Sequence, residues 1–422
     1  MNTRMKIAFV SQPWNDVAPP VQSGSIAIWT YEVARRLARS CDVIVYAKRR
    51  RHQKKVETHE GVQYRHIPIG LDTGVQRLLK PCFRFRSAQR PLFASPLYYL
   101  SYIRRIAADV QAQQCDIVHL FNFSQFAPLI RAFNPHVKIV LRMSCEWLTQ
   151  LDRTLIERRL QDTDLIIGCS EYITAKIRKR FPHASTRCQT VYNGRDVHHF
   201  VQKSRDDVSR LNGDKNLLFV GRVTPEKGVH VLLEAFQRVV AQYPKVQLTI
   251  VGPHDSTPRE FVIALSNDPK VADLSAFYAE RFSTYLHRQL APSVAEKVHF
   301  TGSIPFLELV QHYQNADAFI FPSIWDEPSG NPPIEAMAAG IPVVSTCTGG
   351  TPEYVEHGKT GLLVEAGDVQ QLTNAILSLL ENEDLRQSMG EAARQRAVQY
   401  FSCERMAENL LYQYKTICQV EA

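Results

Sequence analysis

The chain has 422 residues, enough for two domains of ordinary size, and 45% of them are hydrophobic, which excludes a disordered protein. Its formal net charge of +8 is divided unevenly. Residues 1–195 hold 31 Lys and Arg against 14 Asp and Glu (+17), whereas residues 196–422 hold 19 against 28 (−9). This split predicts different partners for the two halves, and the basic half suits an anionic one such as phospholipid head groups or a lipid-linked phosphate. A solvated surface could account for part of the excess of positive charge in residues 1–195.

The chain carries no sign of an extracellular or membrane-spanning protein. Its nine cysteines stand singly, with no C-x-x-C pair, which favours free thiols in a reducing compartment. The first residues, MNTRMKIAFVSQPW, lack the apolar core of a signal peptide, and no apolar run approaches the roughly 20 residues that span a bilayer. We therefore expect a cytoplasmic protein, with peripheral contact at the inner face of the membrane as an open alternative.

The first half reads as alternating strands and helices. A buried strand is predicted at 6–10, followed by a Pro-rich loop and a helix from about 25 to 39. Further strands are predicted at 43–46, 64–67, 116–121, 138–142 and 164–168. The strand, turn and helix start around Gly24 would form an anion site, because the free amides of a helix N-terminus suit a diphosphate.

The segment 76–106 combines basic and aromatic residues and holds no acidic residue. Its basic residues are Arg77, Lys80, Arg84, Arg86, Arg90, Arg104 and Arg105, and its aromatic residues include Phe83, Phe85, Phe93, Tyr98, Tyr99 and Tyr102. Such a mixture on an amphipathic surface favours contact with an anionic membrane. A wall of an acceptor site, with arginines extended along it, is the other interpretation. Nucleic acid is not expected as a partner, because no nucleic-acid-binding motif accompanies the segment.

The second half restarts the strand and helix alternation after a polar linker. That linker runs from about residue 196 to 214, and a strand is predicted at 217–221. The loop that follows, GRVTPEKG, places Arg222 and Lys227 on either side of the start of a helix at 229–241. Two cations at a helix N-terminus are suited to hold a diphosphate.

The stretch from 319 to 364 reads as strand, loop, helix and strand. The strands are predicted at 318–321 and 342–345, with a short helix at 332–340 between them. Glu327 lies in the loop and Glu335 in the helix, eight positions apart. Both would lie at the carboxyl end of a parallel sheet, where open α/β folds bind ligands. Helices are then expected near 368–381, 383–400 and 403–419.

This stretch, EPSGNPPIEAMAAGIPVV with the following GG..E.V..G..G.LV, resembles the paired-glutamate signature of family 4 glycosyltransferases. The resemblance implies an α/β protein with two facing Rossmann-like domains and parallel sheets, the GT-B fold. Residues 1–195 would bind the acceptor and residues 196–402 the nucleotide sugar. The helix 403–422 would pack back on the first domain.

The resemblance also assigns roles to residues at matching positions. The residues carried over are Gly24, His119, Arg222, Lys227, Glu327, Gly330, Asn331 and Glu335. Arg222, Lys227 and the Gly24 turn would stabilise the departing diphosphate, and Glu335 would bind the ribose hydroxyls. Glu327 would hold the donor sugar, with the Gly330 and Asn331 amides nearby.

Three further residues are candidates for the site on weaker sequence grounds. His119 is expected at the carboxyl end of its strand, where the family's histidine contacts the donor sugar and its leaving group. Arg142 and Glu146 are acceptor-side candidates. The chain departs from the family at Ser23, where a glycine pair is usual, and at Ser329, where phenylalanine is common; the second departure leaves the packing of the donor sugar open.

The implied reaction is transfer of a sugar from a nucleoside diphosphate to a hydroxyl of a glycan, glycolipid or lipid-linked acceptor, with retention of configuration. The D-x-D at 162–164 opens a buried strand, and no other cluster has metal-ligand spacing, so we expect no metal and no cofactor beyond the co-substrate. The alternatives are a phosphorylase or sugar-nucleotide epimerase of the same fold, and a catalytically silent scaffold that binds partner enzymes or anionic membrane.

Overall fold

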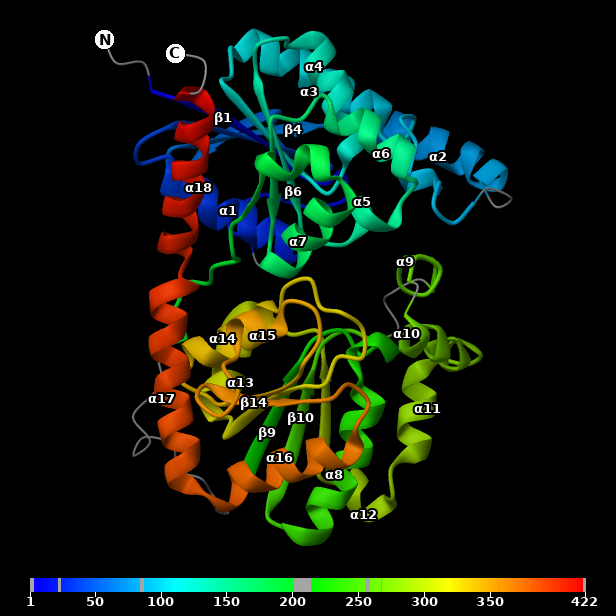
Figure 1. Ribbon diagram of the computed structural model, residues 1–422, viewed down its shortest axis with the longest axis vertical. Helices are drawn as coiled ribbons and strands as arrows, with labels where there is room; N and C mark the ends of the chain where they lie inside the picture. The colour runs from blue at the N-terminus through cyan, green and yellow to red at the C-terminus, as the bar shows by residue number, and fades with distance from the viewer. Residues whose placement is uncertain are drawn as a thin grey trace. The chain divides into compact units, whose positions relative to one another are not determined.

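The computed structural model (Figure 1) describes residues 4–21, 24–83, 87–200, 214–254, 259–266 and 268–419. Ser23, residues 84–86 of the basic segment and residues 201–213 of the expected linker lie outside this range. The chain divides into two compact units. Unit 1 comprises Met1–Asn193 and Cys403–Ala422, and unit 2 comprises Gly194–Ser402.

Unit 1 is built on an eight-stranded sheet with the order β3-β4-β2-β1-β5-β6-β7-β8. The strands are β1 (Lys6–Val10), β2 (Asp42–Lys48), β3 (Val56–His59), β4 (Val62–Ile67), β5 (Ile117–Phe121), β6 (Lys138–Met143), β7 (Leu165–Gly168) and β8 (Cys188–Thr190). The short β3–β4 hairpin is antiparallel and the other described pairings are parallel. Its apolar strands are buried on both faces, as parallel strands between helices require.

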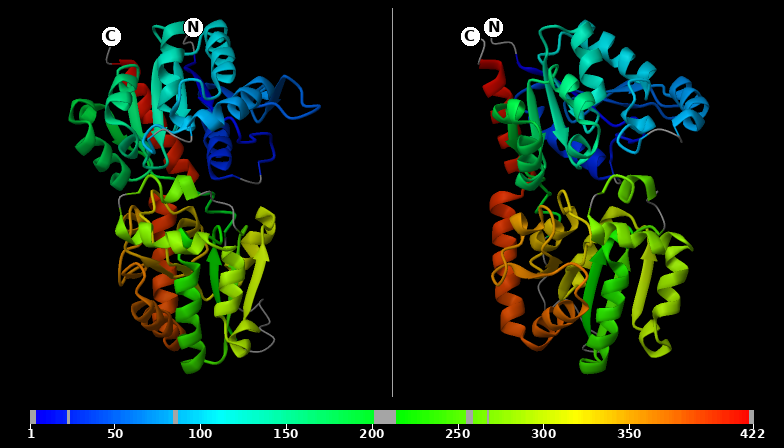
Figure 2. Two further views of the ribbon diagram at one scale, coloured as in Figure 1. Left: turned by 90° about the vertical axis from the view of Figure 1, so that its right-hand side faces the viewer. Right: turned by 45° about the vertical axis from the view of Figure 1, so that its right-hand side comes forward.

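The helices of unit 1 include one from the far end of the sequence. Helix α18 (Cys403–Gln419) packs against α1 (Ser25–Leu37), and both bury their apolar faces on β1, β2 and β5 (Figure 2). The other α-helices are α2 (Gly70–Phe83), α3 (Leu100–Gln113), α4 (Ala127–Phe133), α5 (Trp147–Gln150), α6 (Arg153–Leu160) and α7 (Glu171–Arg180). Short 3-10 turns are η1 (Leu92–Ala94), η2 (Ser124–Phe126) and η3 (Pro182–Arg187).

Unit 2 holds a six-stranded parallel sheet with the order β11-β10-β9-β12-β13-β14. The strands are β9 (Lys215–Val220), β10 (Val246–Val251), β11 (Val298–Gly302), β12 (Ala318–Phe321), β13 (Val343–Thr346) and β14 (Gly361–Val364). One face of this sheet shares an apolar core with α8 (Val229–Gln242), α11 (Phe282–Gln289) and α16 (Val369–Glu381).

Helix α14 (Asn331–Ala338) packs against β12, β13 and the long α17 (Glu383–Tyr400). The remaining α-helices of unit 2 are α9 (Arg259–Val262), α10 (Pro269–Asp273), α12 (Pro292–Ala295), α13 (Phe306–Asn315) and α15 (Thr351–Tyr354). Its 3-10 turns include η5 (Pro225–Lys227) and η6 (Leu274–Tyr278). In the part of the chain that the structure describes, no helix is long and apolar enough to cross a bilayer.

The predicted fold class, two α/β domains with parallel sheets, is confirmed. Each sheet also contains a topological switch point, at which successive strands are added on opposite sides. In unit 1 this point lies between β1 and β5, and in unit 2 between β9 and β12. Ligands of open α/β sheets bind in the crevice that forms there, beyond the carboxyl ends of the strands.

The basic segment 76–106 is not one amphipathic surface. It is divided among α2, η1 and α3. Three of its aromatic side chains, Phe93, Tyr99 and Tyr102, are buried in unit 1. The expectation that these rings lie on an interface is wrong, because the rings fill the packing between the helices and the sheet.

Candidate active site

Two loops of unit 2 meet at its switch point. One follows β9 and runs from Gly221 to Gly228, and the other follows β12 and runs from Pro322 to Gly330. Gly228 has φ +70°, and a Cβ there would lie 1.9 Å from the Pro322 carbonyl oxygen. Because another side chain would displace backbone, glycine lets the two loops pack directly on each other.

Lys227 and Glu327 are joined across these loops. Lys227 Nζ lies 2.5 Å from Glu327 Oε1, and the same oxygen accepts hydrogen bonds from Ser323 Oγ (2.6 Å) and Trp325 Nε1 (2.7 Å). The ammonium also lies 5.0 Å from the Trp325 ring centroid. Both side chains are largely buried, so the pair is a fixed, charge-assisted contact rather than a mobile surface ion pair.

The backbone of Glu327 is fixed by the glycine pair that follows β13. Gly350 N donates to the Glu327 carbonyl oxygen at 2.7 Å, and Gly349 N donates to Asp326 Oδ1 at 3.1 Å. A Cβ on Gly349 would come within 2.2 Å of the Glu327 carbonyl oxygen. The carboxylate therefore projects from a loop held on both sides.

Glu335, in the second turn of α14, already has two partners inside unit 2. Arg195 Nε lies 2.8 Å from its Oε1, and Tyr313 donates its hydroxyl to Oε2 at 2.9 Å. The desolvated Tyr313 hydroxyl, next to this carboxylate, has a pKa well above its usual range and stays protonated. A carboxylate has about four lone-pair positions, so Glu335 can still accept ligand hydroxyls.

Helix α14 begins Asn331-Pro332-Pro333, and this weakens its N-terminus as an anion site. Proline fixes the φ of the first turn but has no N–H. Two of the first three helical positions therefore offer no donor to an anion. The amides of Gly330 and Asn331 remain, so negative charge at this point would depend chiefly on Arg222 and Lys227.

Glu226 is a polar residue of this site that the sequence reasoning missed. It is fully buried on η5, and its Oε1 lies 3.4 Å from Arg222 Nη2. Neither carboxylate oxygen accepts a hydrogen bond from any described residue. Its carbonyl oxygen accepts from Ile324 N at 2.9 Å, on the loop that carries Glu327. Glu226 thus contacts both loops. Its position in the sequence between Arg222 and Lys227 was the signal that could have identified it as part of the site.

In unit 1 Gly24 lies in the connection from β1 to α1, directly before the helix. Gly24 precedes α1 with φ +84°, and Ile28 N donates to its carbonyl oxygen at 2.9 Å. The first turn of α1 contains no acidic residue. This glycine therefore starts the helix in a backbone conformation that other residues avoid, as an anion-binding turn requires.

His119 is not at the end of its strand, as the sequence suggested, but in the middle of β5. Its side chain is 0% exposed, stacks on Trp29 at 5.5 Å, and places Nδ1 2.7 Å from the Tyr414 hydroxyl of α18. Burial, together with the nearby Arg142 cation, holds the pKa of His119 well below its usual value, so the imidazole is neutral. The structure places His119 in the core of unit 1, whereas Asn122 follows the strand end.

Arg142, an acceptor-side candidate, is also buried. It donates to the Val191 carbonyl oxygen at 3.2 Å and to Asn193 Oδ1 at 2.7 Å, and its guanidinium lies 4.5 Å from the Trp29 ring centroid. The expectation that it reaches an acceptor is wrong, since it fixes the end of unit 1 instead. Glu146 is partly buried and pairs with Lys176 at 2.7 Å.

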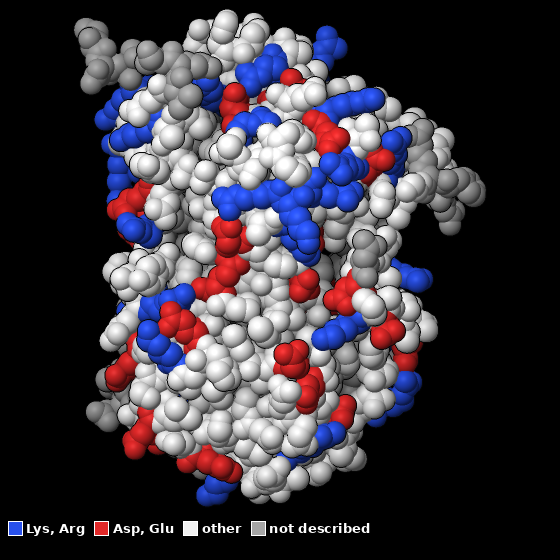
Figure 3. Space-filling model, in the orientation of Figure 1, with Lys and Arg blue, Asp and Glu red and all other residues white. Residues whose placement is uncertain are grey.

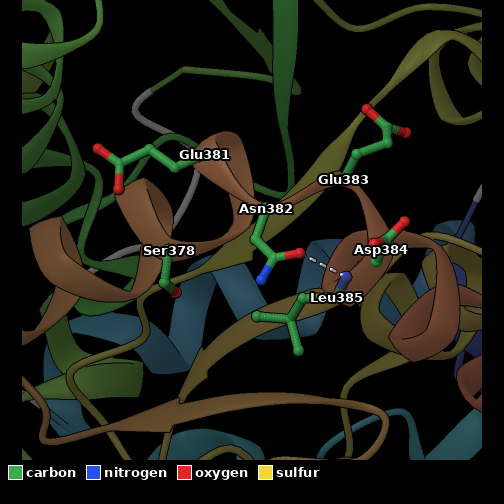
Figure 4. Close-up of a pocket in the computed structure, with 6 residues that line it drawn as sticks. All are labelled: Ser378, Glu381, Asn382, Glu383, Asp384 and Leu385. Atoms are coloured by element: carbon green, nitrogen blue, oxygen red, sulfur yellow. Dashed lines mark hydrogen bonds between the residues drawn. The ribbon is translucent and has the colours of Figure 1, made fainter.

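Asp164 of the D-x-D opens β7 and accepts from Arg131 Nη2 and from Ile139 N, both at 2.6 Å. A pocket elsewhere in unit 2, at the junction of α16 and α17, is lined by Glu381, Asn382 and Asp384 among others (Figure 4). Asn382 caps α17 there by accepting from Leu385 N. This pocket contains none of the candidate residues, and it belongs to the joint between two helices.

Comparisons with known proteins identify the family and the fold. The family described as "Glycosyltransferase Family 4" matches residues 26–199, and "Glycosyl transferases group 1" matches residues 201–396. The chain is 27% identical to spore coat protein SA of Bacillus subtilis, over 97% of this chain and 99% of that protein. It is 26% identical to a D-inositol 3-phosphate glycosyltransferase of Corynebacterium urealyticum, over 98% and 96%.

Solved structures show the same fold. Sucrose-phosphate synthase of Thermosynechococcus elongatus matches with a TM-score of 0.74 at 20% identity, covering 99% of this chain and all of that one. Anabaena HepE in complex with UDP-glucose matches with a TM-score of 0.68 at 19% identity, covering 98% of this chain and all of that one.

Proposed function

Since the chain belongs to the family 4 glycosyltransferases, we propose that it transfers a sugar from a nucleoside diphosphate sugar to an acceptor hydroxyl, with retention of anomeric configuration and without a metal ion. The observation that carries this proposal is the Lys227–Glu327 contact at the switch point of unit 2. A cation for phosphate and a carboxylate for sugar hydroxyls are there fixed side by side.

The chemical task is to stabilise negative charge on the departing diphosphate while positive charge develops on the anomeric carbon. Lys227 and Arg222 supply fixed positive charge beside the loop that starts α8. Because the prolines of α14 remove amide donors, these two cations carry most of that task. Positive groups that need no rearrangement during the reaction are the most effective kind of electrostatic catalyst.

Glu226 is proposed as the residue that positions Arg222. Its buried carboxylate lies 3.4 Å from the guanidinium, and the Arg222 side chain is 38% exposed, so phosphate oxygens can reach the cation that Glu226 orients. Its carbonyl contact with Ile324 keeps the same segment aligned with the Glu327 loop. Glu226 acts through Arg222 and is not proposed to touch the donor.

Glu327 is proposed to orient the donor sugar rather than to attack it. Three donors converge on its Oε1, and such a carboxylate is stabilised in place and is a weak nucleophile. We therefore favour attack by the acceptor from the side of the leaving group, with a phosphate oxygen receiving the proton. Glu335, already oriented by Arg195 and Tyr313, would accept the ribose hydroxyls.

The range of candidate donors and acceptors can be narrowed by analogy with similar proteins. HepE, a protein of the same fold, was solved with UDP and with UDP-glucose, so uridine nucleotides are tested first. A capsular polysaccharide biosynthesis glycosyltransferase of Staphylococcus aureus is 30% identical over 49% of this chain. We propose a glycan, glycolipid or lipid-linked acceptor for unit 1, with cytoplasmic location and peripheral contact of this basic unit with an anionic membrane.

A thermal-shift series with UDP, GDP, ADP, CMP and their sugars tests the donor assignment. A nucleotide at about 100 times its Kd should stabilise the folded protein by roughly 2.7 kcal/mol. We expect one base to do so in the wild type and in Lys359→Ala, an exposed-lysine control, but not in Arg222→Ala. Product NMR would establish retention, and EDTA should leave turnover unchanged. Stabilisation by every nucleotide equally would contradict a donor site selective for one base, and stabilisation of Arg222→Ala as in wild type would contradict the proposed clamp.

A further inference from the structure

Helix α2 lies on the margin of unit 1 (Figures 1 and 2). It carries a stripe of exposed apolar side chains. Leu71, Val75 and Leu78 are 67%, 45% and 78% exposed. Their spacing of four and three residues places them on one face of the helix. Leu97 and Leu100, before and at the start of α3, are exposed as well. Large apolar side chains gathered on one surface in this way mark a binding surface.

Positive charge accompanies this stripe. Arg77 and Lys80 of α2, and Arg104 and Arg105 of α3, are exposed, and α3 packs against α2. On the face drawn in Figure 3, Lys and Arg side chains are the more frequent charged groups over unit 1. On α2 the helical repeat places Arg77 on the flank of the stripe and Lys80 on the opposite side of the helix, while Arg104 and Arg105 lie on the neighbouring α3.

Negative charge is kept away from the same surface. Asp72 is the one acidic residue between positions 61 and 108 of the sequence. Its side chain is buried, and its two carboxylate oxygens accept from Ser101 N (2.8 Å) and Tyr102 N (3.1 Å) at the start of α3. This acid thus fastens α2 to α3 and adds no charge to the outside.

We propose that α2 docks on an anionic lipid bilayer, with Leu71, Val75 and Leu78 in the interfacial layer and Arg77, Arg104 and Arg105 at the phosphate groups. The inference deepens the membrane contact proposed above and relocates it. Three of the aromatic residues expected to make the contact, Phe93, Tyr99 and Tyr102, are buried, and exposed apolar groups lie on α2, in part before residue 76.

The charge pattern favours a bilayer over other occupants. An amphipathic helix with cations beside its apolar face lies in the plane of an anionic membrane, where both features are satisfied together. A second copy of this chain docked through the same surface would place like charges opposite each other, since Arg77, Arg104 and Arg105 are basic and Asp72 is buried.

Flotation of the full chain with vesicles tests the proposal. Vesicles of phosphatidylcholine with equimolar phosphatidylglycerol are compared with phosphatidylcholine alone. We expect binding to the anionic vesicles, reduced at least about tenfold in Leu71→Ser/Leu78→Ser and in Arg77→Glu/Arg104→Glu. Tyr412→Ser removes an equally exposed apolar group from α18, and Lys54→Glu/Lys55→Glu makes the same change of net charge on another exposed stretch of unit 1. Both controls should bind as the wild type does.

Each other outcome overturns the proposal. Equal loss in both charge variants would mean a diffuse attraction without a docking surface, and absence of wild-type binding would exclude membrane contact. A dimer that sedimentation detects in wild type and that Leu71→Ser/Leu78→Ser abolishes, without vesicle binding, would assign the stripe to a second copy. Nucleotide stabilisation, measured on the same variants, should be unchanged. Its absence in wild type would count against the proposed donor site and not against α2.

Discussion

The two units have related sheets, yet the polar side chains near their switch points differ in exposure and in partners. At the switch point of unit 2, charged groups from two loops contact one another, and the Arg222 side chain remains 38% exposed. Next to the switch point of unit 1, the polar groups His119 and Arg142 are sealed within the core around Trp29 and Tyr414.

The difference separates two uses of a buried polar side chain. In unit 2 the buried carboxylates Glu226 and Glu327 lie beside cations that can also bind a ligand. Burying these carboxylates costs free energy of folding, and in return the protein gains a binding site. In unit 1 the buried imidazole is neutral, and its Nδ1 pairs with a tyrosine of α18 while its Nε2 has no hydrogen-bond partner among the described residues, so we expect it to contribute to packing. Substitutions in unit 2 should therefore change ligand binding, and those in unit 1 should change stability.

The largest effect is expected from Lys227→Ala. Removing the ammonium leaves Glu327 buried without its cation and takes one positive charge from the diphosphate, so kcat/KM for the donor should fall at least about a hundredfold. Lys359→Ala, which removes an exposed lysine of the same unit, should leave kcat/KM unchanged. A fall of less than threefold in Lys227→Ala would break the comparison between the units.

His119→Ala should act on stability instead. The substitution leaves a cavity and an unpaired Tyr414 hydroxyl, and the free energy of unfolding should fall by roughly 2–4 kcal/mol in urea titrations. The donor KM of the folded fraction should not change. His136→Ala, an exposed histidine of unit 1, should be neutral. If His119→Ala instead lowered kcat at unchanged stability, His119 would belong to the reaction, as the sequence first suggested.

The pH dependence of stability sharpens the same test. Because the pKa of folded His119 lies well below 6.5, the unfolded chain binds a proton below that pH that the folded chain does not. Unfolding therefore becomes easier as the pH falls, by up to about 1.4 kcal/mol per pH unit for this residue. The slope between about pH 5 and pH 6.5 should be smaller in His119→Ala than in wild type.

The smallest effect is expected from Glu226→Gln. Without the negative charge Arg222 is less well held, and the donor Kd should rise about tenfold. In an Arg222→Ala background the same change should have little effect, because Glu226 acts through Arg222. Calorimetry of the four proteins in this cycle measures the coupling. Additive effects would show that Glu226 serves the fold alone.

Much of the fold could be read from the sequence because its strands are short apolar runs between polar loops. The predicted ends of α17, Glu383 and Tyr400, agree with the structure, because capping and helix-breaking residues at helix ends can be recognised in a sequence. Strands β3 and β8 were missed. The first, VETH, is an exposed edge, and the second is three residues long, so neither has an apolar run.

The site was read less well in unit 1 than in unit 2. Arg222, Lys227 and Glu327 lie on loops whose sequence places them at strand ends. His119 was misplaced because IVHLF contains one polar residue in an apolar run, and the sequence does not show that the hydroxyl of Tyr414, 295 positions away, pairs with its Nδ1. Likewise, alternating rings and arginines in 76–106 did not reveal which face of each helix the core takes.

Helix α18 bears on how the protein is made. The core of unit 1 includes Cys403, Met406 and Leu410, which a ribosome adds after the whole of unit 2. The nascent residues 4–193 therefore emerge with an apolar groove on α1 and β1 that stays open while about 200 further residues are translated. Unit 2 can reach its native state first, although most of unit 1 is translated before it. During synthesis the earlier unit would be the one that depends on chaperones.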